Sequence, residues 1–275
     1  MTDIKLICLD MDGTLLDSDH ATVPPRNIRA LRAAAERGAA VCIASGRAWA
    51  LLEDVYRQMP FTRYAILSNG AAVLDIARGE WLVRNCLPDG ARVRLIDLLL
   101  EWGVPFEVYA GGENYIQADR REQVLSAALS PQFAQVLSTR SRLPADLNAA
   151  LPAGEVEKIH VFAVPPERRE ELAARAAAWG PLSVTSSFGQ NMEFTAPGVN
   201  KGAAARALCA RMGWTAEQVM AFGDAGNDLE LLAWARWSFA MANGTDQARA
   251  AARYTAPANT EAGVGRAVER YFLDA

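Results

Sequence analysis

The sequence predicts an α/β protein in which a doubly wound parallel sheet is interrupted by an inserted α+β domain. Short apolar runs alternate with helical segments at both ends of the chain, which is typical of a parallel sheet with helices on both faces. Between residues 86 and 189, short strand pairs mix with helices, which favours an open, partly antiparallel sheet. We therefore expect a discontinuous core of residues 1–85 and 190–275 and an inserted domain of residues 86–189.

The N-terminal segment has three predicted strands. Residues 4–9, 39–44 and 64–67 are nearly continuous apolar runs, which suit strands buried on both faces of a sheet. Helices are predicted between them over residues 27–37 and 49–59, because apolar positions recur there at helical spacing and a glycine or a proline follows. Strand, helix, strand, helix, strand is the order expected of a doubly wound sheet.

The pattern changes after the third strand. A hairpin is predicted from residues 72–74 and 81–83. Two helices are expected over residues 89–102 and 166–179. The short strands predicted in and around the insert are residues 104–109, 115–118, 158–164, 182–186 and 192–195.

The alternating pattern resumes after residue 198. The apolar runs at residues 219–222 and 237–241 predict two more strands of the parallel sheet. The helices predicted around them are residues 202–212, 228–235, 247–252 and 263–272.

The composition disfavours several classes of function. The chain has 275 residues, 51% hydrophobic and 22% charged, which is the composition of a folded protein rather than a disordered one. Its net charge of -4 disfavours nucleic acid as the main partner, because phosphate backbones need dense Lys and Arg. No apolar stretch approaches the ~20 residues of a membrane helix. Four scattered cysteines and an N-terminus unlike a signal peptide lead us to expect a cytoplasmic protein.

The strongest motif follows the first predicted strand and reads Asp-Met-Asp-Gly-Thr. Its two carboxylates, Asp10 and Asp12, stand at the carboxyl end of a strand, where open α/β sheets bind ligands. Like charges in a cleft repel each other, so the pair needs a cation or a proton. The plain alternative is a turn with two solvated acids.

A second acidic motif, Gly-Asp-Ala-Gly-Asn-Asp, follows the strand predicted at residues 219–222 and adds Asp224 and Asp228. Carboxylates gathered at strand ends suit Mg²⁺, which prefers oxygen ligands. The alternative is a turn followed by a helix N-cap, and this fits Asp228 better than Asp224.

Two further segments could bind an anion. Ser45, Gly46 and Arg47 follow the strand at residues 39–44 and offer a hydroxyl and backbone amides at a predicted helix start. Lys201 lies just before another predicted helix and could neutralise a phosphate group. The alternatives are a simple helix cap for Ser45 and a solvated surface lysine for Lys201.

In this order, the four motifs resemble those of the haloacid dehalogenase superfamily, in its Cof-type branch with a large cap domain between the second and third motifs. Residues 67–71 and 239–243 resemble the same branch. The resemblance covers both core segments closely, and the insert only in its length and strand-helix pattern. It implies a Rossmann-like core and a Mg²⁺-dependent phosphatase of small phosphate monoesters, such as sugar phosphates or phosphorylated cofactors. Specificity would lie in the cap.

The resemblance also implies the chemistry of the acidic residues. Asp10 would be the nucleophile that forms an aspartyl-phosphate. Asp12 would be the general acid for the leaving oxygen and then the base that activates water. The metal ion would be held by the side chains of Asp10 and Asp224 and by the backbone carbonyl of Asp12, with Asp228 completing or orienting that shell.

The remaining motif residues are implied to bind the substrate. Ser45, Gly46 and Lys201 would bind the oxygens of the transferring phosphoryl group, where charge must be stabilised. The residues expected close to the substrate are Arg47, Asn69, Gly70 and Asn227.

Other functions remain open at this stage. A phosphosugar mutase would share the aspartyl-phosphate, so the motifs do not separate it from a phosphatase. A phospho-accepting signalling domain is disfavoured by the length, and a non-catalytic phosphate binder by the paired acids. His20 and His160 are the only histidines, so the sequence offers few candidate residues for a His-based zinc site or a Ser-His-Asp triad. Trp81, Tyr109 and Tyr115 are interpreted as packing residues rather than as the lining of a pocket.

Overall fold

The computed structural model of the chain describes residues 3–128, 130–186 and 190–274. Contacts between residues divide it into two compact units. Unit 1 consists of Met1–Arg47, Leu52–Val83 and Asn200–Ala275. Unit 2 consists of Ala48–Leu51 and Arg84–Val199.

Unit 1 is built on an eight-stranded sheet with the order β14-β13-β12-β1-β2-β3-β4-β5. The six strands from β14 to β3 are parallel, and β4 runs antiparallel to β3. The strands are β1 Leu6–Leu9, β2 Ala40–Ala44, β3 Tyr64–Leu67, β4 Ala72–Asp75, β5 Glu80–Arg84, β12 Val219–Gly223, β13 Trp237–Met241 and β14 Tyr254–Ala256.

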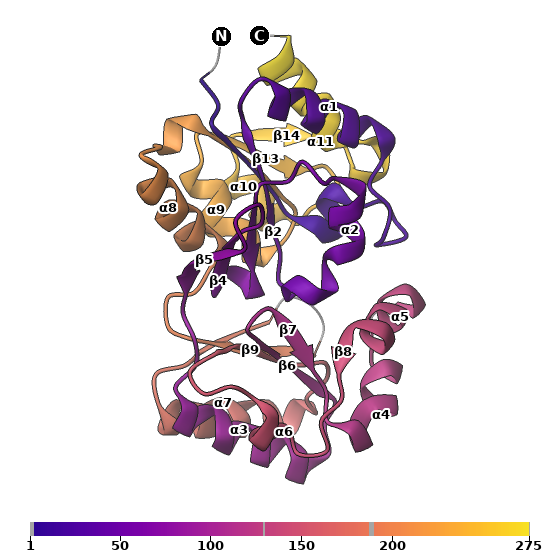
Figure 1. Ribbon diagram of the computed structural model, residues 1–275, viewed down its shortest axis with the longest axis vertical. Coiled ribbons are helices and arrows are strands. Elements are labelled where there is room, and N and C mark those ends of the chain that lie inside the picture. The colour runs from indigo at the N-terminus through magenta and orange to yellow at the C-terminus, as the bar shows by residue number, and fades with distance from the viewer. Residues whose placement is uncertain (1–2, 129, 187–189, 275) are drawn as a thin grey trace. The chain divides into compact units, whose positions relative to one another are not determined.

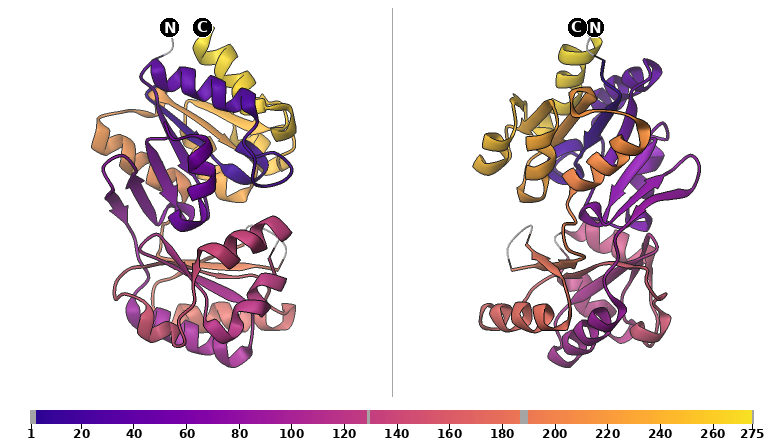
Figure 2. Two further views of the ribbon diagram at one scale, coloured as in Figure 1. Left: turned by 45° about the vertical axis from the view of Figure 1, so that its right-hand side comes forward. Right: turned by 90° about the vertical axis from the view of Figure 1, so that its left-hand side faces the viewer.

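Helices lie on both sides of this sheet, as the two views of Figure 2 show. On one side, α8 packs against β3 and β4, and α9 packs against α8. Elsewhere, α1 and α11 lie side by side (Figure 1). The helices of unit 1 are α1 Pro25–Glu36, α2 Glu53–Gln58, α8 Lys201–Met212, α9 Leu229–Trp234, α10 Asp246–Ala251 and α11 Gly263–Val268.

The central strands are apolar on both faces because both faces are covered. In β1, Leu6 and Cys8 belong to an apolar cluster with Leu208 of α8, while the intervening Ile7 and the final Leu9 are also fully buried. This is why the run predicted at residues 4–9 shows no alternation. The predicted doubly wound α/β fold is confirmed, and its parallel strands bring their carboxyl ends to one edge of the sheet.

Unit 2 is built on a six-stranded sheet with the order β10-β11-β9-β6-β7-β8. Its strand pairs are antiparallel except for β7 with β8. The strands are β6 Phe106–Ala110, β7 Glu113–Tyr115, β8 Ser141–Arg142, β9 Val156–Val161, β10 Ser183–Thr185 and β11 Met192–Thr195. The helices are α3 Asp89–Trp102, α4 Arg121–Ser126, α5 Pro131–Arg140, α6 Leu147–Ala150 and α7 Pro166–Trp179.

The two faces of the unit 2 sheet carry different side chains. Phe106 and Val108 of β6 join the main apolar cluster of the unit, with residues of α3, α6 and α7. These three helices lie together along one side of the sheet in Figure 1. Tyr109 belongs to a second cluster, with Phe133 and Leu137 of α5. Since successive residues of a strand point to opposite faces, this alternation separates the two clusters.

Several parts of the structure differ from the expected elements. The predicted helix over residues 49–59 is divided into a single turn at Trp49–Leu51 and α2. The turn belongs to unit 2, where Leu51 packs with Tyr109. The strand expected at residues 115–118 is β7 and ends at Tyr115. Helices α4, α5 and α6 and strands β8 and β14 were not predicted, because they are short and, around the helices, prolines mark breaks rather than a helical pattern.

The division of the chain also differs from the expected residues. Unit 2 extends to Val199 rather than to residue 189, which itself lies outside the described residues. The reason is β11, which pairs with β9 and β10 of the unit 2 sheet. Among the described residues, no helix is both long and apolar enough to span a membrane.

Candidate active site

The sequence motifs of unit 1 meet at the carboxyl edge of its sheet. Asp10 directly follows β1, and its backbone N–H donates to the carbonyl of Phe222 in the neighbouring β12 at 3.1 Å. The chain then turns at Gly13, which has a φ of 81°. A Cβ atom at Gly13 would lie 2.5 Å from an oxygen of Asp224, so glycine lets the two acidic motifs approach each other closely.

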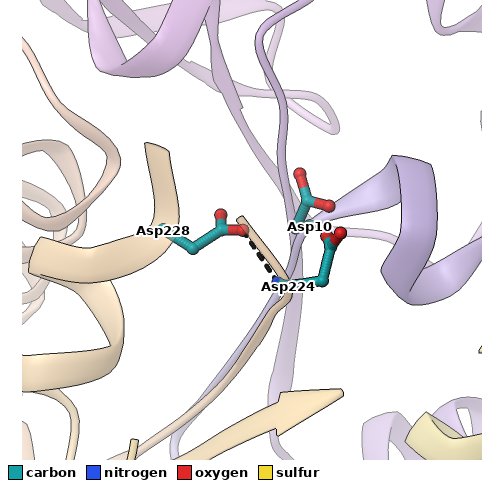
Figure 3. Close-up of side chains that lie close together, drawn as sticks. All are labelled: Asp10, Asp224 and Asp228. Atoms are coloured by element: carbon teal, nitrogen blue, oxygen red, sulfur yellow. Dashed lines mark hydrogen bonds between the residues drawn. The ribbon is translucent and has the colours of Figure 1, made fainter. Parts of the chain in front are cut away.

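Asp10, Asp224 and Asp228 form a cluster of carboxylates (Figure 3). One oxygen of each lies within 4.8 Å of the others. Asp228 Oδ2 accepts the backbone N–H of Asp224 at 3.0 Å and that of Ala225 at 3.2 Å. Thr14 Oγ1 donates to Asp224 Oδ1 at 3.0 Å. These contacts orient the carboxylates of Asp228 and Asp224 before any ligand binds.

Lys201 connects this cluster. Its Nζ lies 2.5 Å from Asp10 Oδ1 and 2.7 Å from Asp228 Oδ1, and the side chain is fully buried. Lys201 is the first residue of α8, which Asn200 caps by accepting the backbone N–H of Ala203 at 2.7 Å. The alternative of a solvated surface lysine is therefore wrong.

The cluster brings three carboxylates together with one ammonium. Burial raises the pKa of Asp10 well above its usual range, and Asp228 and Asp224 add to this rise against the opposing effect of Lys201. Burial and Asp228 also raise the pKa of Asp224 to about 6. Burial alone would lower the pKa of Lys201, but Asp10 and Asp228 outweigh it and raise that pKa. One ammonium does not balance three carboxylates, two of which are buried.

A divalent cation fits this arrangement. The donors are carboxylate oxygens, the ligand type that Mg²⁺ prefers, and their mutual repulsion falls when a cation lies among them. The side chain of Asp12 is not part of this group of three carboxylates.

Asp12 is held in a separate ion pair. Arg47 Nη2 lies 2.7 Å and 2.8 Å from the two carboxylate oxygens of Asp12, and His20 Nδ1 lies 3.1 Å from Oδ1. Burial would raise the pKa of Asp12, but Arg47 and His20 outweigh it and lower that pKa. The hydrogen bond to Asp12 in turn raises the pKa of His20. Arg47 thus forms an ion pair with Asp12, the residue expected to act as general acid and base.

Ser45 and Gly46 lie at the end of β2, next to Arg47. Ser45 is buried, and its Oγ accepts the backbone N–H of Arg47 at 3.1 Å. Its carbonyl accepts the backbone N–H of Asn69 at 3.0 Å. The hydroxyl therefore orders the turn after β2, as a capping residue would.

The residues expected near the substrate are linked through Asn69. Asn227 Nδ2 donates to Asn69 Oδ1 at 3.2 Å, which joins the loop after β3 to the second acidic motif. Gly70 has a φ of 106°, and a Cβ atom there would lie 2.3 Å from the carbonyl oxygen of Asn200. This close approach brings the loop after β3 against the start of α8.

Three residues of the site were missed by sequence reasoning. His20 contacts Asp12 from the loop before α1, and Thr14 contacts Asp224. Asn243 Nδ2 donates to the carbonyl of Gly13 at 2.8 Å. Thr14 lies in the first acidic motif and Asn243 in the segment 239–243, both of which resemble the family. Nothing in the sequence around His20 indicates its role.

Comparison with known proteins agrees with this geometry. The sequence model of the family described as haloacid dehalogenase-like hydrolase matches residues 7–268. A 5-amino-6-(5-phospho-D-ribitylamino)uracil phosphatase of Bacillus subtilis is 27% identical over 271 residues, 98% of this chain and 97% of that protein. The HMP-PP phosphatase of Serratia proteamaculans is 30% identical over 247 residues, 88% of this chain and 85% of that protein. A crystal structure of a haloacid dehalogenase-like hydrolase from Bacteroides thetaiotaomicron has a TM-score of 0.84 at 25% identity, covering 98% of this chain and 100% of that chain.

Proposed function

The chain belongs to the haloacid dehalogenase-like hydrolases and is a phosphoric monoester hydrolase, and from this premise we propose that Asp10 attacks its substrate to form an aspartyl-phosphate. The observation that carries the proposal is the pairing of two acids with different partners. Asp10 lies among carboxylates and contacts Lys201, whereas Asp12 contacts Arg47. A protein that only bound phosphate would not need a second, separately held acid two residues after the first.

The reaction takes place in two steps. A carboxylate oxygen of Asp10 bonds to phosphorus while the bond from phosphorus to the alcohol oxygen breaks, and Asp12 donates its proton to that oxygen. In the second step, a water molecule attacks phosphorus and gives a proton to Asp12. The bond between phosphorus and Asp10 then breaks, and inorganic phosphate leaves.

Arg47 controls which form Asp12 takes. Its guanidinium favours the ionised carboxylate, which is the form that accepts a proton from water. A phosphate dianion bound beside Arg47 would compete for this guanidinium and would raise the pKa of Asp12. Asp12 would then carry the proton that the leaving alcohol needs in the first step.

The carboxylate cluster would hold Mg²⁺. The expected ligands are the side chains of Asp10 and Asp224 and the backbone carbonyl of Asp12, with Asp228 orienting the loop around them. Bound there, the ion supplies positive charge that offsets the repulsion between Asp10 and the phosphate dianion. Ser45, Gly46 and Lys201 would bind the phosphoryl oxygens. The ammonium of Lys201 would need little reorientation to do so, because Asp10 and Asp228 already hold it in place.

Unit 2 would act as the cap that sets substrate specificity. The substrate class proposed is a small, phosphorylated metabolite, a sugar phosphate or a phosphorylated cofactor. Support comes from the two curated relatives, which are named as phosphatases of different phosphorylated small molecules. We further propose that the protein acts in the cytoplasm, where such metabolites occur.

Phosphate release from a panel of phosphate monoesters tests the proposal. The panel holds hexose and pentose phosphates, pyridoxal phosphate, flavin mononucleotide and p-nitrophenyl phosphate, each with Mg²⁺. We expect wild-type protein to release phosphate from several of them. Release from none by folded, Mg²⁺-loaded protein would contradict the proposal, and bisphosphate-dependent isomerisation of a sugar phosphate would indicate a mutase instead.

A further inference from the structure

Three asparagine side chains hold the loop that carries Asp12, and the proposed reaction gives them no role. The loop consists of the turn Met11–Leu15 and of Leu16 after it. It is not a regular helix, because Asp12 and Gly13 within it have non-helical φ and ψ angles. A loop of this kind lacks the repeated hydrogen bonds of a helix, so its backbone carbonyls need other donors.

Two buried asparagines supply donors at the end of the loop. Asn27 Nδ2 donates to the carbonyl of Leu15 at 3.2 Å, and Asn259 Nδ2 donates to the carbonyl of Leu16 at 2.9 Å. Asn27 belongs to α1, whereas Asn259 begins the turn Asn259–Glu261 that precedes α11. Leu15 and Leu16 are fully buried, and a buried carbonyl is costly to leave unpaired, so both bonds stabilise this conformation of the loop.

A third asparagine contacts the loop next to the acid itself. Asn243, in the loop after β13, donates from Nδ2 to the carbonyl of Gly13 at 2.8 Å, one residue after Asp12. Its Oδ1 accepts the backbone N–H of Asn259 at 3.0 Å, so these two asparagines are connected to each other. We call Asn27, Asn243 and Asn259 the asparagine clamp.

The clamp also ties the loop to the C-terminal helix of unit 1. Asn27 Oδ1 accepts the backbone N–H of Gly265, in α11, at 2.8 Å. A Cβ atom at Gly265 would lie 3.0 Å from Asn27 Oδ1 and 2.9 Å from the carbonyl oxygen of Arg26, so glycine lets α11 approach α1 this closely. Asn27 and Asn243 therefore each donate to the loop and accept from residues 259–265. This double use needs an amide, which carries donors and an acceptor on one group.

The clamp bears on Asp12 more than on Asp10. The backbone N–H of Asp10 donates to Phe222 in the sheet, and its carboxylate contacts Lys201. Asp12 has a side-chain contact to Arg47, but its backbone belongs to the loop that the clamp holds. Loosening the clamp should therefore displace Asp12 while Asp10 stays in place.

We propose that the asparagine clamp positions Asp12 for proton transfer to the leaving oxygen of the phosphate ester. Its members are positioning residues, which act through the backbone of the loop and not on the substrate. A general acid must lie within hydrogen-bond distance of the oxygen that it protonates, and a displacement of about 1 Å can cost on the order of 100-fold in rate. The inference rests on the proposed function, because it concerns the role given there to Asp12.

Two substrates with different leaving groups test this inference. One is whichever sugar monophosphate wild-type protein hydrolyses best, whose alcohol needs a proton from Asp12. The other is p-nitrophenyl phosphate, whose p-nitrophenolate leaves without one. The ratio of the two kcat/KM values, sugar phosphate over p-nitrophenyl phosphate, measures the contribution of the acid, and the folded fraction of the protein cancels in it. Asn259→Leu keeps a branched side chain of similar length without the donor and should lower this ratio ~10-fold.

Three further variants keep the test decisive. Asn243→Ala should lower the ratio ~5-fold, and because Asn243 is exposed it covers the case in which Asn259→Leu does not fold. Asp12→Asn removes the acid and should lower the ratio most. Ser238→Ala is the matched control: the buried Ser238 Oγ accepts the backbone N–H of Arg253 at 3.0 Å near the amino end of β13, and its loss should leave the ratio unchanged.

Several outcomes would overturn the inference. A ratio within about twofold of wild type in the folded clamp variants would mean that the asparagines serve stability alone. A larger loss for p-nitrophenyl phosphate than for the sugar phosphate would mean that the clamp positions Asp10 instead. An equal fall of the ratio in Ser238→Ala would remove the link to the loop. Failure of the proposed function looks different: wild-type protein releases phosphate from neither substrate, or Asp12→Asn leaves the ratio unchanged, and the inference then fails with it.

Discussion

The ammonium of Lys201 lies 2.5 Å from Asp10 Oδ1, although 191 positions of sequence separate the two residues. The same ammonium lies 2.7 Å from Asp228 Oδ1, so it connects the acidic motifs that follow β1 and β12. A buried cation between two buried carboxylates stabilises the ionised form of each of them. Removing it would leave charges without compensation in a low-dielectric interior.

Lys201→Met should therefore destabilise the protein. We expect the free energy of unfolding to fall by ~3–5 kcal/mol near neutral pH, measured by urea denaturation in the presence of a chelator. Lys5→Met is the matched control, because Lys5 is half-exposed and its ion pair among the described residues is with Asp3 at the surface. A loss no larger than that of Lys5→Met would show that Lys201 does not compensate the cluster.

Mg²⁺ binding should depend on pH through Asp224. The pKa of Asp224 in the folded protein is about 6, above the ordinary value of 3.8. The protonated form therefore stabilises the metal-free protein below pH 3.8, and this contribution is lost as the pH rises through about 6. Since a metal ion needs the ionised carboxylate, Mg²⁺ affinity should weaken as the pH falls below about 6.

Calorimetric titration with Mg²⁺ at several pH values measures this dependence. Chelation with EDTA should also abolish phosphate release, and added Mg²⁺ should restore it. Asp224→Asn should bind Mg²⁺ weakly at every pH and should remain inactive after Mg²⁺ addition. Full activity in EDTA would be incompatible with a metal ion at this cluster.

Arg47 and His20 should differ in their effect on Asp12. Arg47 makes two contacts to the carboxylate and is mostly buried, so Arg47→Met should lower kcat/KM by ~10–100-fold for a sugar phosphate, whose alcohol leaving group needs the proton of Asp12. His20 is half-exposed, and exposed pairs contribute little, so His20→Gln should lower it by no more than ~5-fold. Equal effects of the two variants would argue against the control of Asp12 by Arg47.

The parts of the site that the sequence predicts are those that local pattern determines. Asp10, Ser45 and Asp224 each follow an apolar run, and the carboxyl ends of parallel strands meet at one edge of a sheet. Their neighbourhood can therefore be inferred without a structure. The pairing of Arg47 with Asp12 could not be inferred from the sequence, because either side chain could equally point to solvent or to the substrate.

Unit 2 was harder to predict for physical reasons. Helix α6 has four residues and α4 has six, too few for an apolar stripe at helical spacing to be recognised. Tyr109 was interpreted as a packing residue, and it does belong to an apolar cluster. Its hydroxyl also donates to Glu107, a contact that depends on the strand positions rather than on the local pattern.

Asp10→Asn should reduce phosphate release by ~10³-fold or more while leaving the fold intact, because an amide of nearly the same shape cannot attack phosphorus. Asp54→Asn provides the matched control, since Asp54 is exposed and pairs with Arg57 at the surface of α2. Steady-state release from p-nitrophenyl phosphate measures both variants. Activity of Asp10→Asn near that of the control would contradict the assignment of the nucleophile.

Trapping the covalent intermediate tests the central claim most directly. Protein mixed with p-nitrophenyl phosphate that carries radioactive phosphorus is quenched in acid during turnover, and the labelled peptide is identified. The p-nitrophenolate leaving group needs no proton from Asp12, so only the second step depends on that residue. We predict label on the peptide that contains Asp10 in wild-type protein, more of it in Asp12→Asn, in which water is not activated, and none in Asp10→Asn. Label on another residue, or phosphate release with no labelled protein in any variant, would contradict the account.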